Sequence, residues 1–449
     1  VTRVSVDPMT SPATSPATSP ATYPDSYYSR SLADDRRRPA LDGDQQATVC
    51  VIGGGLAGLN TLLGLAERGV SAILLEARRV GWGASGRNGG FVSAGYAQSH
   101  DRIRARVGAD AAGELHRLSR AAIDLIKARI ERYDIACGPL TPGVLAATWF
   151  RRGHDLPRAA EARNAALGGR LEYWPVDRLR QALATDRYHG ALFDPDAFTF
   201  HALNFTRGIA DAALANGGRL FEDSPVLSVN RQGDRHAVRT ARGRVLADHV
   251  VYCCSGYLGW LHPRLAWSTI PVGTYVMVTA PLGDRLASAI RVPHGVADDR
   301  IAQDYYRALP DGRILWGGYV SAVTQPRHLE AKMRAAMSRV YPQLADVPIA
   351  AAWPGTMGYA THKMPQIGRL APGVWYNQGF GGHGMNTTTL GGEVIARAIA
   401  EGDETWRLFQ PFGLTFAGGP LAPVAAQTAY WLYQARDGWR AWRDRRAGD

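Results

Sequence analysis

The sequence predicts a two-domain α/β (α+β) fold in which a Rossmann-like domain accompanies a domain built on an antiparallel sheet. Between residues 48 and 76 a strand, a glycine-rich turn, a helix and a second strand follow one another, which is the order of a right-handed βαβ unit. Residues 271–280 and 312–320 alternate as half-buried antiparallel strands do. The 449 residues suffice for two domains with sizeable cores or for one interleaved pair.

Composition and charge narrow the classes of protein. Hydrophobic residues make up 46% of the chain and charged residues 20%, as in a globular protein, and no apolar run is long enough to predict a membrane-spanning helix. The net charge is +11, but its arginines are scattered, which favours anionic small ligands over nucleic acid. The four cysteines form no C-x-x-C pair and no secretory signal is evident, so we expect a reduced, cytoplasmic protein without a metal site.

The N-terminal segment differs in composition from the rest. Residues 11–22 repeat the tetrapeptide SPAT, which cannot bury enough apolar surface to fold, so we predict a disordered tail over residues 1–24. The basic run DDRRRP at 34–39 is interpreted as a solvated face or linker, with contact to nucleic acid as the alternative.

Regular structure is predicted from Thr48 onward. TVCVI (48–52) is a short apolar run typical of a strand buried on both faces, and apolar residues then recur at helical spacing as far as Gly69. SAILLE (71–76) is a second buried strand. An amphipathic helix is predicted over 108–133 and another helix over 202–216.

The second half of the chain is richer in strand signals. We predict strands at 225–229, at 237–247 as two strands joined at Arg242-Gly243, and at 248–256. The last forty residues include WLYQARDGWRAWRDRR (431–446), a basic helix with several aromatic residues. We interpret it as a helix packed on the body of the protein, with a helix lying on a membrane surface as the alternative.

The first glycine cluster predicts a nucleotide site. Gly53, Gly55 and Gly58 open a helix directly after a buried strand, so that the chain can turn tightly, approach a pyrophosphate and pack helix on strand. Phosphate charge would lie at the helix N-terminus. Glu76 ends the second strand, where a carboxylate accepts hydrogen bonds from an adenosine ribose. These residues predict an adenosine dinucleotide without a 2′-phosphate, but they do not separate NAD from FAD.

A second glycine-rich loop favours a flavin. VGWGASGRNGG (80–90) follows Glu76 closely, and a domain that binds NAD has no evident need for it. Small residues would let the backbone lie against the pyrophosphate, ribityl chain and ring of an extended flavin. A plain surface loop would not explain why Ser85, Arg87 and Asn88 interrupt the glycines.

Four motifs in order carry a resemblance to a known family: TVCVIGGGLAGL, LEARRVGWGASGRNGG, DHVVYCCSGYLG and GFGGHGMNTTTLGGEVIARAI. Together they resemble the FAD-dependent D-amino-acid oxidase and sarcosine oxidase (DAO) superfamily, in particular its γ-glutamylputrescine oxidase-like branch. An early Ser26-Tyr27-Tyr28 segment, QDYYRALPDGRILWGG (303–318) and GYATHKMPQIGRL (358–370) are similar to that branch as well. The resemblance spans about residues 25–435.

The resemblance implies non-covalent FAD on a discontinuous Rossmann-like domain made of residues 45–105, 196–262 and 352–405. Residues 106–195 and 263–351 would form the substrate domain with its antiparallel sheet and some helices, and residues 406–449 a C-terminal helical extension. Glu76 would hold the ribose, and the backbone of Val226 would contact the adenine. The residues implied to bind FAD are Gly53, Gly55, Leu56, Ala57, Gly58, Glu76, Ala77, Arg78, Gly83, Ala84, Ser85, Arg87, Asn88, Gly89, Val226, Ser255, Gly256, Gly381, Gly382, His383, Gly384 and Met385.

The implied reaction is the oxidation of a C–N bond. A neutral amine, such as a polyamine, would give hydride to flavin N5, the imine would hydrolyse to an aldehyde, and O2 would reoxidise the flavin and yield H2O2. An apolar pocket suits this reaction because desolvation lowers the pKa of the amine. Two alternatives remain open: an amine or amino-acid dehydrogenase that passes electrons to a quinone or carrier, and a flavin-binding protein without turnover.

Aromatic residues are the candidates for the substrate pocket. Tyr305, Tyr306 and Trp353 would form its walls with Arg307 beside them, and ordinary core packing is the alternative for the three aromatic residues. Relatives that act on amino acids usually grip the carboxylate with a cation, and in the sarcosine oxidase pattern a lysine follows the GHG motif by two positions. Here Asn386 stands at that position, which argues against an amino-acid substrate.

No catalytic residue is assigned, but His383 and Lys363 are the candidates. GGHGMNTTTLGGEVIARAI (381–399) is interpreted as a third stretch that folds back on the FAD domain, with a helix that starts near Asn386 and aims N–H groups at the flavin N1/O2 edge. His383 is then a positional residue beside the flavin rather than a general base. Lys363 either assists O2 reduction near the flavin or is a surface charge.

Overall fold

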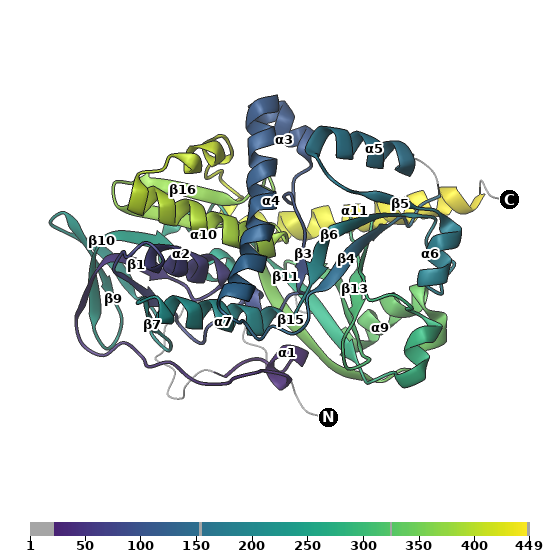
Figure 1. Cartoon of the computed structure of the whole chain (residues 1–449), viewed down its shortest axis with the longest axis horizontal. Helices are drawn as coiled ribbons and strands as arrows, with labels where there is room; N and C mark the ends of the chain where they lie inside the picture. Colours follow the sequence, from purple (N-terminus) through teal and green to yellow (C-terminus); the bar gives the residue numbers. More distant parts are fainter. Residues whose placement is uncertain (1–21, 152–154, 324–325, 447–449) are drawn as a thin grey trace.

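The computed structural model of the protein describes residues 22–151, 155–323 and 326–446 (Figure 1). Of the tail predicted over residues 1–24, the part up to residue 21 lies outside these ranges. Two sheets stand side by side, and the long helix α4 (Ala109–Arg132) lies between the helices of the first sheet and the second sheet (Figure 1). The predicted two-domain α/β architecture is confirmed.

The first sheet has eight strands and a parallel centre. Its main path runs β16 (Gln366–Ala371), β17 (Val374–Gln378), β10 (Arg244–Tyr252), β1 (Gln45–Ile52), β2 (Ala72–Leu75) and β7 (Arg219–Phe221). β17, β10, β1, β2 and β7 are parallel neighbours, and β8 (Ser228–Gln232) and β9 (Arg235–Arg239) extend β10 as an antiparallel meander. Val49 and Val51 are fully buried, as expected of parallel strands covered on both faces.

Helices cover this sheet, and two of them are in close contact. α2 (Leu56–Ala66) and α10 (Gly384–Glu401) lie side by side over the sheet, with α7 (Ala202–Ala215) next to α2 (Figure 1). A Cβ added at Gly392 would lie 2.6 Å from the Cβ of Asn60, and one at Gly64 would lie 2.8 Å from the Cβ of Ala396. Side chains at these glycines would therefore push the helices apart. The helix expected to start near Asn386 begins two residues earlier, at Gly384.

The second sheet has nine strands and is almost wholly antiparallel. Its path runs β15 (Ile349–Tyr359), β11 (Ile270–Thr279), β14 (Ile314–Ser321), β13 (Tyr305–Ala308), β12 (Gly295–Asp298), β4 (Thr141–Ala147), β6 (Ala191–Thr199) and β3 (Phe91–Val92), with β5 (Glu172–Trp174) beside β6. Only the β12–β4 pair is parallel among the strands described. The remaining α-helices are α1 (Tyr27–Arg30), α3 (His100–Val107), α5 (Leu156–Leu167), α6 (Val176–Ala182), α8 (Pro263–Ala266), α9 (Leu329–Val340) and α11 (Ala422–Arg446).

The strands of the second sheet are more deeply buried than the sequence predicts. β11 and β14 pair antiparallel as expected, but most residues of both strands are buried on both faces. Leu315 belongs to the core shared with the first sheet, whereas Trp316 belongs to a second core with Tyr306 and Tyr341. The expectation of half-buried strands is therefore wrong, because hydrophobic cores lie on both faces of this sheet.

Two strand boundaries also differ from the prediction. The strand expected at 225–229 begins only at Ser228, because Ser224 donates its backbone N–H to the carbonyl of Glu76 (2.8 Å) and leads the chain away from the ladder. The strands expected on either side of residue 248 are one strand, β10. Its first half pairs with β9 and its last residues pair with β17.

β15 belongs to the second sheet, although its residues from 352 onward were expected in the domain of the first sheet. Residues 352–405 were expected in the FAD-binding domain, yet β15 pairs with β11 along its whole length in the nine-stranded sheet.

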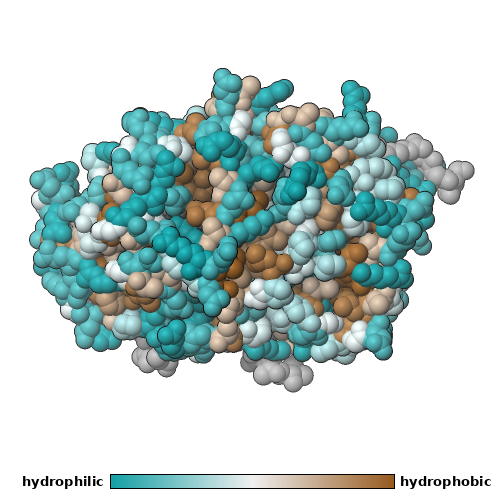
Figure 2. All heavy atoms as spheres, in the orientation of Figure 1, coloured by the Kyte–Doolittle hydropathy of each residue, from teal (hydrophilic) through white to brown (hydrophobic). Residues whose placement is uncertain are grey.

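The surface shown in Figure 2 is predominantly hydrophilic over both sheets, with scattered apolar patches. No helix in the described parts of the chain is long and apolar enough to cross a lipid bilayer.

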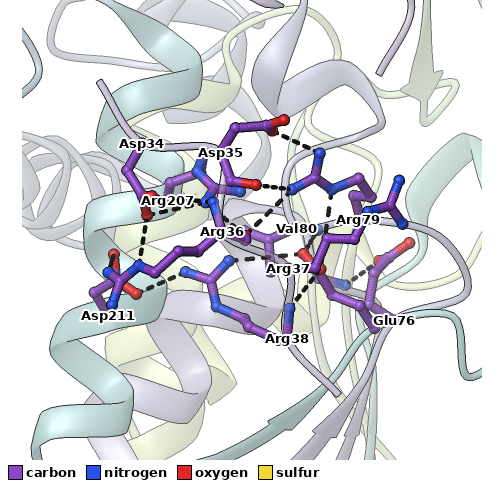
Figure 3. Close-up of polar contacts among 12 residues, drawn as sticks. Asp34, Asp35, Arg36, Arg37, Arg38, Glu76, Arg79, Val80, Arg207 and Asp211 are labelled. Carbon is purple, nitrogen blue, oxygen red and sulfur yellow. Dashed lines mark hydrogen bonds and ion pairs between the residues drawn. The ribbon is translucent and has the colours of Figure 1, made fainter. Parts of the chain in front are cut away.

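The basic run at 34–39 fastens the N-terminal segment to the first sheet, and we call residues 34–39 the strap (Figure 3). Glu222 is fully buried and accepts hydrogen bonds from the backbone N–H groups of Arg38 (3.0 Å) and Val80 (2.8 Å). The guanidinium groups of Arg38 and Arg79 lie 3.6 and 3.9 Å from its oxygens. The interpretation as a solvated face or linker is thus wrong for Arg38, whose side chain is 7% exposed.

We expect the buried carboxylate of Glu222 to contribute most of the stability that this strap gives the fold. Glu222→Ala leaves the backbone N–H groups of Arg38 and Val80 without their buried acceptor, so it should lower the free energy of unfolding by about 2 kcal/mol or more. The guanidinium groups of Arg38 and Arg79 lose a nearby carboxylate but keep their closer partners, Asp211 and Asp35. The measurement is urea unfolding followed by circular dichroism. Glu404→Ala is the control, because Glu404 pairs with Arg407 at an exposed site and its loss should change the free energy by less than about 0.5 kcal/mol. Equal effects of the two substitutions would contradict the role of the strap.

Candidate cofactor and substrate site

The motif loops meet at one edge of the first sheet. Gly53 follows β1, Glu76 follows β2, Cys253 follows β10, and the glycines from Gly379 onward follow β17. The four strands are parallel, so their carboxyl ends lie at the same edge. Hydrogen bonds join the first residues beyond the strands: Gly53 N–H to the carbonyl of Leu75 (2.9 Å) and Cys253 N–H to that of Ile52 (2.8 Å). In open α/β sheets this edge is where ligands bind.

The first glycine cluster forms a turn without room for side chains. A Cβ at Gly58 would lie 2.0 Å from the carbonyl oxygen of Gly53, and Gly53 has a φ of +110°. The carboxylate of Glu76 accepts the N–H of Gly54 (2.6 Å) and that of Arg78 (2.8 Å). The structure therefore brings the predicted glycines and Glu76 together. The structure also places Gly54 in this site. The spacing of the motif did not include Gly54, although the run of three glycines from Gly53 to Gly55 could have indicated it.

Burial dominates the electrostatics of Glu76. Removal of its carboxyl group from water raises its pKa to about 7, and the nearby charge of Glu222 adds to the shift. The N–H donors of Gly54 and Arg78 lower the pKa by less than burial raises it. Near neutral pH the group is thus divided between its protonated and ionised forms, so further donors would favour the ionised form.

Two further segments reach the same edge. The N–H of Asp223 donates to the carbonyl of Arg78 (2.9 Å), so the loop that leads to Val226 runs beside the residues that follow β2. The turn at Ser255 and Gly256 packs on β15: a Cβ at Gly358 would lie 2.4 Å from the Oγ of Ser255. Ser255 has a left-handed φ of +48°, which holds this turn against the second sheet.

The second glycine-rich loop is folded by its own polar side chains. The Oγ of Ser85 accepts the N–H of Leu56 (2.9 Å) at the start of α2. Asn88 donates its amide to the carbonyl of Ala84 (3.0 Å) and accepts the N–H of Gly90 (2.8 Å). These bonds place residues 83–90 against the first turn of α2.

Arg87 carries a buried cation into this loop. Its guanidinium stacks 4.0 Å from the ring centroid of Trp82, and its Nε donates to the carbonyl of the same residue (2.7 Å). Its Nη2 is buried and has no hydrogen-bond partner among the described residues. Burial lowers the pKa of the guanidinium. A buried donor of this kind favours an anionic or oxygen-rich ligand.

The third stretch closes over the same region. Gly381 and Gly382 have φ values of +62° and +82°, and the N–H of Gly381 donates to the carbonyl of Gly358 (3.0 Å). The Nε2 of His383 lies 3.2 Å from the carbonyl oxygen of Ser93 and must carry the hydrogen, because a carbonyl only accepts. Burial lowers the pKa of His383. The imidazole is therefore neutral and held by the backbone.

The residues after His383 are also engaged. Met385 is buried at the start of α10. The amide of Asn386 donates to the carbonyl of Gly95 (3.3 Å), and its side chain is buried. The N-cap of α10 supplies no side-chain hydrogen bond, so the first N–H groups of the helix are not capped by a side chain there.

One face of β15 joins the second and third glycine-rich stretches. Trp353 donates its Nε1–H to the carbonyl of Arg87 (2.9 Å). Met357 and Tyr359 share that face by strand alternation. A Cβ at Gly382 would lie 3.4 Å from the Sδ of Met357 and 2.8 Å from the hydroxyl of Tyr359. This strand therefore places an aromatic and apolar surface between the loop of Arg87 and the GGHG turn.

The predicted pocket residues fall on two faces of the second sheet. Tyr305 lies against the second loop, where a Cβ at Gly89 would be 2.5 Å from its ring. Tyr306 points to the other face, where it stacks on Trp316 with ring centroids 4.3 Å apart. The expectation that both tyrosines line one pocket is corrected, since neighbouring residues of a strand face opposite sides.

Arg307 is occupied by the backbone of the second loop. Its Nε donates to the carbonyl of Gly89 (2.9 Å) and its Nη2 to that of Phe200 (2.8 Å). The hydroxyl of Tyr28 lies 3.4 Å from the same Nη2, and the ring of Tyr28 packs edge-on to Trp353. Arg307 and Tyr28 are therefore positioning residues for this loop.

Sequence reasoning missed the roles of Tyr28 and Tyr359. The segment Ser26-Tyr27-Tyr28 carried only a resemblance, and nothing in it indicated that Tyr28 would be fully buried against the second sheet. Tyr359 had a usable signal: it lies six residues after Trp353, so it shares a strand face with that residue. Burial raises its pKa to about 12.

Lys363 lies in the turn after β15 rather than on the strand itself. Its φ is +58°, and its N–H donates to the carbonyl of Ala360 (2.9 Å). The neighbouring His362 contacts the carbonyl of Gly413 (3.1 Å) and Thr361 contacts Thr415 (2.7 Å). These contacts tie the turn of Lys363 to the segment that precedes α11.

The residues at this edge fit an adenosine dinucleotide that carries a flavin. The side-chain-free turn at Gly53–Gly58 and the N-terminus of α2 could hold a pyrophosphate, and Glu76 could hold ribose hydroxyls. The buried Nη2 of Arg87 and the face of β15 adjoin the second glycine-rich loop, where a ring could rest. Within the described residues no group of three or more His, Cys, Asp or Glu side chains could hold a metal ion.

Comparison with known proteins agrees with this fit. The family model described as FAD dependent oxidoreductase (DAO) matches residues 48–398. The chain is 36% identical to gamma-glutamylputrescine oxidoreductase of Escherichia coli, over 86% of this chain and 91% of that protein. It is 33% identical to probable oxidoreductase OrdL of Haemophilus influenzae, over 92% and 97% of the two chains. The crystal structure of glycine oxidase from Geobacillus kaustophilus superposes with a TM-score of 0.68 at 20% identity, covering 83% of this chain and 99% of that one.

We expect the affinity for FAD to depend on the ionisation of Glu76. Ribose hydroxyls would donate to the ionised carboxylate, so affinity should rise as pH increases through about 7, the pKa of this group. Glu76→Gln should weaken binding about tenfold or more at alkaline pH and remove the pH dependence. Titration of the apoprotein with FAD, followed by flavin fluorescence, measures both effects.

The raised pKa of Glu76 also predicts how the stability of the apoprotein depends on pH. The folded-state pKa of about 7 exceeds the ordinary glutamate value of 4.5. The contribution of Glu76 to stability is therefore present below pH 4.5 and is lost as the pH rises through about 7. Glu172→Gln on β5 is the control, since Glu172 is an exposed carboxylate outside the site. An unchanged FAD affinity in Glu76→Gln at every pH would contradict the assignment.

Proposed function

The chain belongs to the family of FAD dependent oxidoreductases, and we propose that it oxidises a C–N bond of an amine substrate. The observation that carries the proposal is the single face of β15, where Trp353, Met357 and Tyr359 span the distance from Arg87 to Gly382. This face offers an aromatic, apolar wall beside the residues that fit the flavin. Similarity to an enzyme named for gamma-glutamylputrescine supports an amine of the polyamine class.

We propose that four groups of this chain hold and tune the cofactor. Bound FAD supplies the two-electron oxidation of the C–H bond beside the nitrogen, O2 regenerates it with formation of H2O2, and the imine product hydrolyses to an aldehyde. Glu76 would hold the ribose, and the N-terminus of α2 would hold the pyrophosphate. The buried Nη2 of Arg87 would donate to the cofactor, and the N-terminus of α10, which no side chain caps, would stabilise negative charge on the ring.

The substrate side of the site favours a neutral amine. Aromatic and thioether side chains remove the amine from water, which lowers its pKa and favours the deprotonated form that can be oxidised. Burial raises the pKa of both Tyr305 and Tyr359. Both phenols therefore stay protonated at physiological pH. They can orient the substrate through hydrogen bonds, but they do not act as its base.

The positions where a carboxylate clamp would be sought are otherwise engaged. Asn386 donates to the carbonyl of Gly95, and Arg307 donates to the carbonyls of Gly89 and Phe200. Each side chain holds a backbone segment of the site. These contacts support an amine over a free amino acid as substrate.

We expect the purified protein to be yellow and to lose its flavin absorbance when an amine substrate is added without O2. The screen compares polyamines, gamma-glutamylated polyamines, monoamines, and D- and L-amino acids. Admission of air should restore the absorbance and produce H2O2, which a coupled peroxidase assay measures. Reduced flavin that stays reduced in air would indicate a dehydrogenase, and reduction by amino acids alone would contradict the proposed substrate class.

His383 should act on the flavin and not as a base. Its lowered pKa and its bond to Ser93 predict that His383→Gln changes FAD affinity or the flavin reduction potential while the pH dependence of kcat/KM keeps its limbs. His294→Gln is the control, because His294 bonds to Pro142 in the second sheet. Loss of a limb of the pH profile in His383→Gln alone would assign general-base catalysis to this residue.

A further inference from the structure

The C-terminal helix α11 turns its apolar side chains outward. Trp431 is 61% exposed and Trp439 is 57% exposed, although a large aromatic side chain is normally packed inside. Helical spacing of three or four residues places these side chains on one side of the helix. The side chains of this outer face are Val424, Trp431, Leu432, Trp439 and Trp442, all of which are exposed.

The inner face of α11 is held to the protein by polar groups. Gln427 accepts the N–H of Ala322 (2.9 Å) just beyond β14. Asp437 accepts the N–H groups of Ile301 (3.0 Å) and Ala302 (3.2 Å) in the loop between β12 and β13. A surface helix of a globular protein ordinarily buries its apolar stripe and exposes its polar face. The polarity of α11 is therefore reversed, and folding of this chain does not explain its outer face.

The charge of α11 is sorted between the two faces as well. Its two acidic residues, Asp437 and Asp444, accept backbone N–H groups of the protein body. Arg436, Arg443 and Arg446 are exposed. The guanidinium of Arg443 lies 4.8 Å from the ring centroid of Trp439, and that of Arg446 lies 4.3 Å from the ring of Trp442. The outer face thus combines tryptophan with positive charge and carries no carboxylate.

We propose that the outer face of α11 binds the surface of an anionic lipid bilayer. Tryptophan is enriched where bilayers meet water, and arginine beside it attracts anionic headgroups while its stem lies along apolar surface. A helix of this composition lies in the plane of the interface with its apolar side chains among the headgroups. The charge of the face is complementary to such a surface.

A second copy of the chain fits this face less well. In a two-fold symmetric dimer the same patch meets itself, which would bring the arginines of one α11 toward those of the other. No acidic side chain of the helix is left on the outer face to compensate them. Binding of α11 to a bilayer does not depend on the electron acceptor, so the proposal holds whether O2 or a membrane carrier reoxidises the cofactor.

The test is flotation of the intact FAD-loaded protein with lipid vesicles. We expect it to float with vesicles of phosphatidylglycerol, to float much less with vesicles of phosphatidylcholine, and to be released by high salt. The triple variant Trp431→Ala/Trp439→Ala/Trp442→Ala should lose binding about tenfold or more, because its apolar contact area is removed. Arg436→Gln/Arg443→Gln should lose about fivefold per arginine.

A matched control separates this face from general surface effects. Leu214→Ala on α7 combined with Arg102→Gln on α3 removes one exposed apolar side chain and one exposed cation from other elements, and should leave binding unchanged. Far-ultraviolet circular dichroism and oxidation of amine in solution verify that every variant is folded.

Three results would overturn the proposal. The first is absence of binding to phosphatidylglycerol vesicles by the unsubstituted protein. The second is equal binding by the triple tryptophan variant. The third is a change of oligomeric state in that variant, measured by analytical ultracentrifugation, when the unsubstituted protein binds no vesicles. That result would assign the face to a second copy of the chain.

Discussion

The site depends on close backbone approach where the parallel strands of the first sheet end. The carbonyl oxygen of Gly53 lies so near Gly58 that any side chain there would collide with it, and this contact fixes where α2 begins. The start of α2 in turn fixes Ser85, whose hydroxyl accepts the N–H of Leu56, and hence the second loop. Because the strands are parallel, β10 and β17 deliver their own loops to the same edge. Segments separated by three hundred residues thus form one site.

The second sheet completes that edge from the opposite side. Trp353 and Arg307 both donate to carbonyl groups of the loop from Arg87 to Gly89, so the loop is held between α2 and the sheet. Tyr28 supports both side chains from the N-terminal segment, which the buried carboxylate of Glu222 fastens to the first sheet. The basic strap and the early tyrosines therefore act on the site at a distance, by setting the positions of backbone groups.

Sequence reasoning reached most of the first domain because its signals are local. The strand, the glycines and Glu76 lie within thirty residues, and each requirement follows from the conformation of that short segment. The pocket was harder to predict. Strand alternation shows that Tyr305 and Tyr306 face opposite sides, but which side meets the loop depends on the partners of β13. Burial of β11 and β14 on both faces and the early exit at Ser224 were likewise set by distant segments that local patterns do not contain.

The C-terminal helix shows why composition alone left two interpretations open. Its residues include two acids, five arginines and three tryptophans, and that mixture is compatible with packing on the body or with a membrane surface. The hydrogen bonds made by Gln427 and Asp437 give the helix a polar face that packs on the body and an outer face that stays compatible with a membrane surface. Packing on the body uses the polar face. The tryptophans left outside then cost free energy in water, unless a surface that the chain does not itself supply covers them.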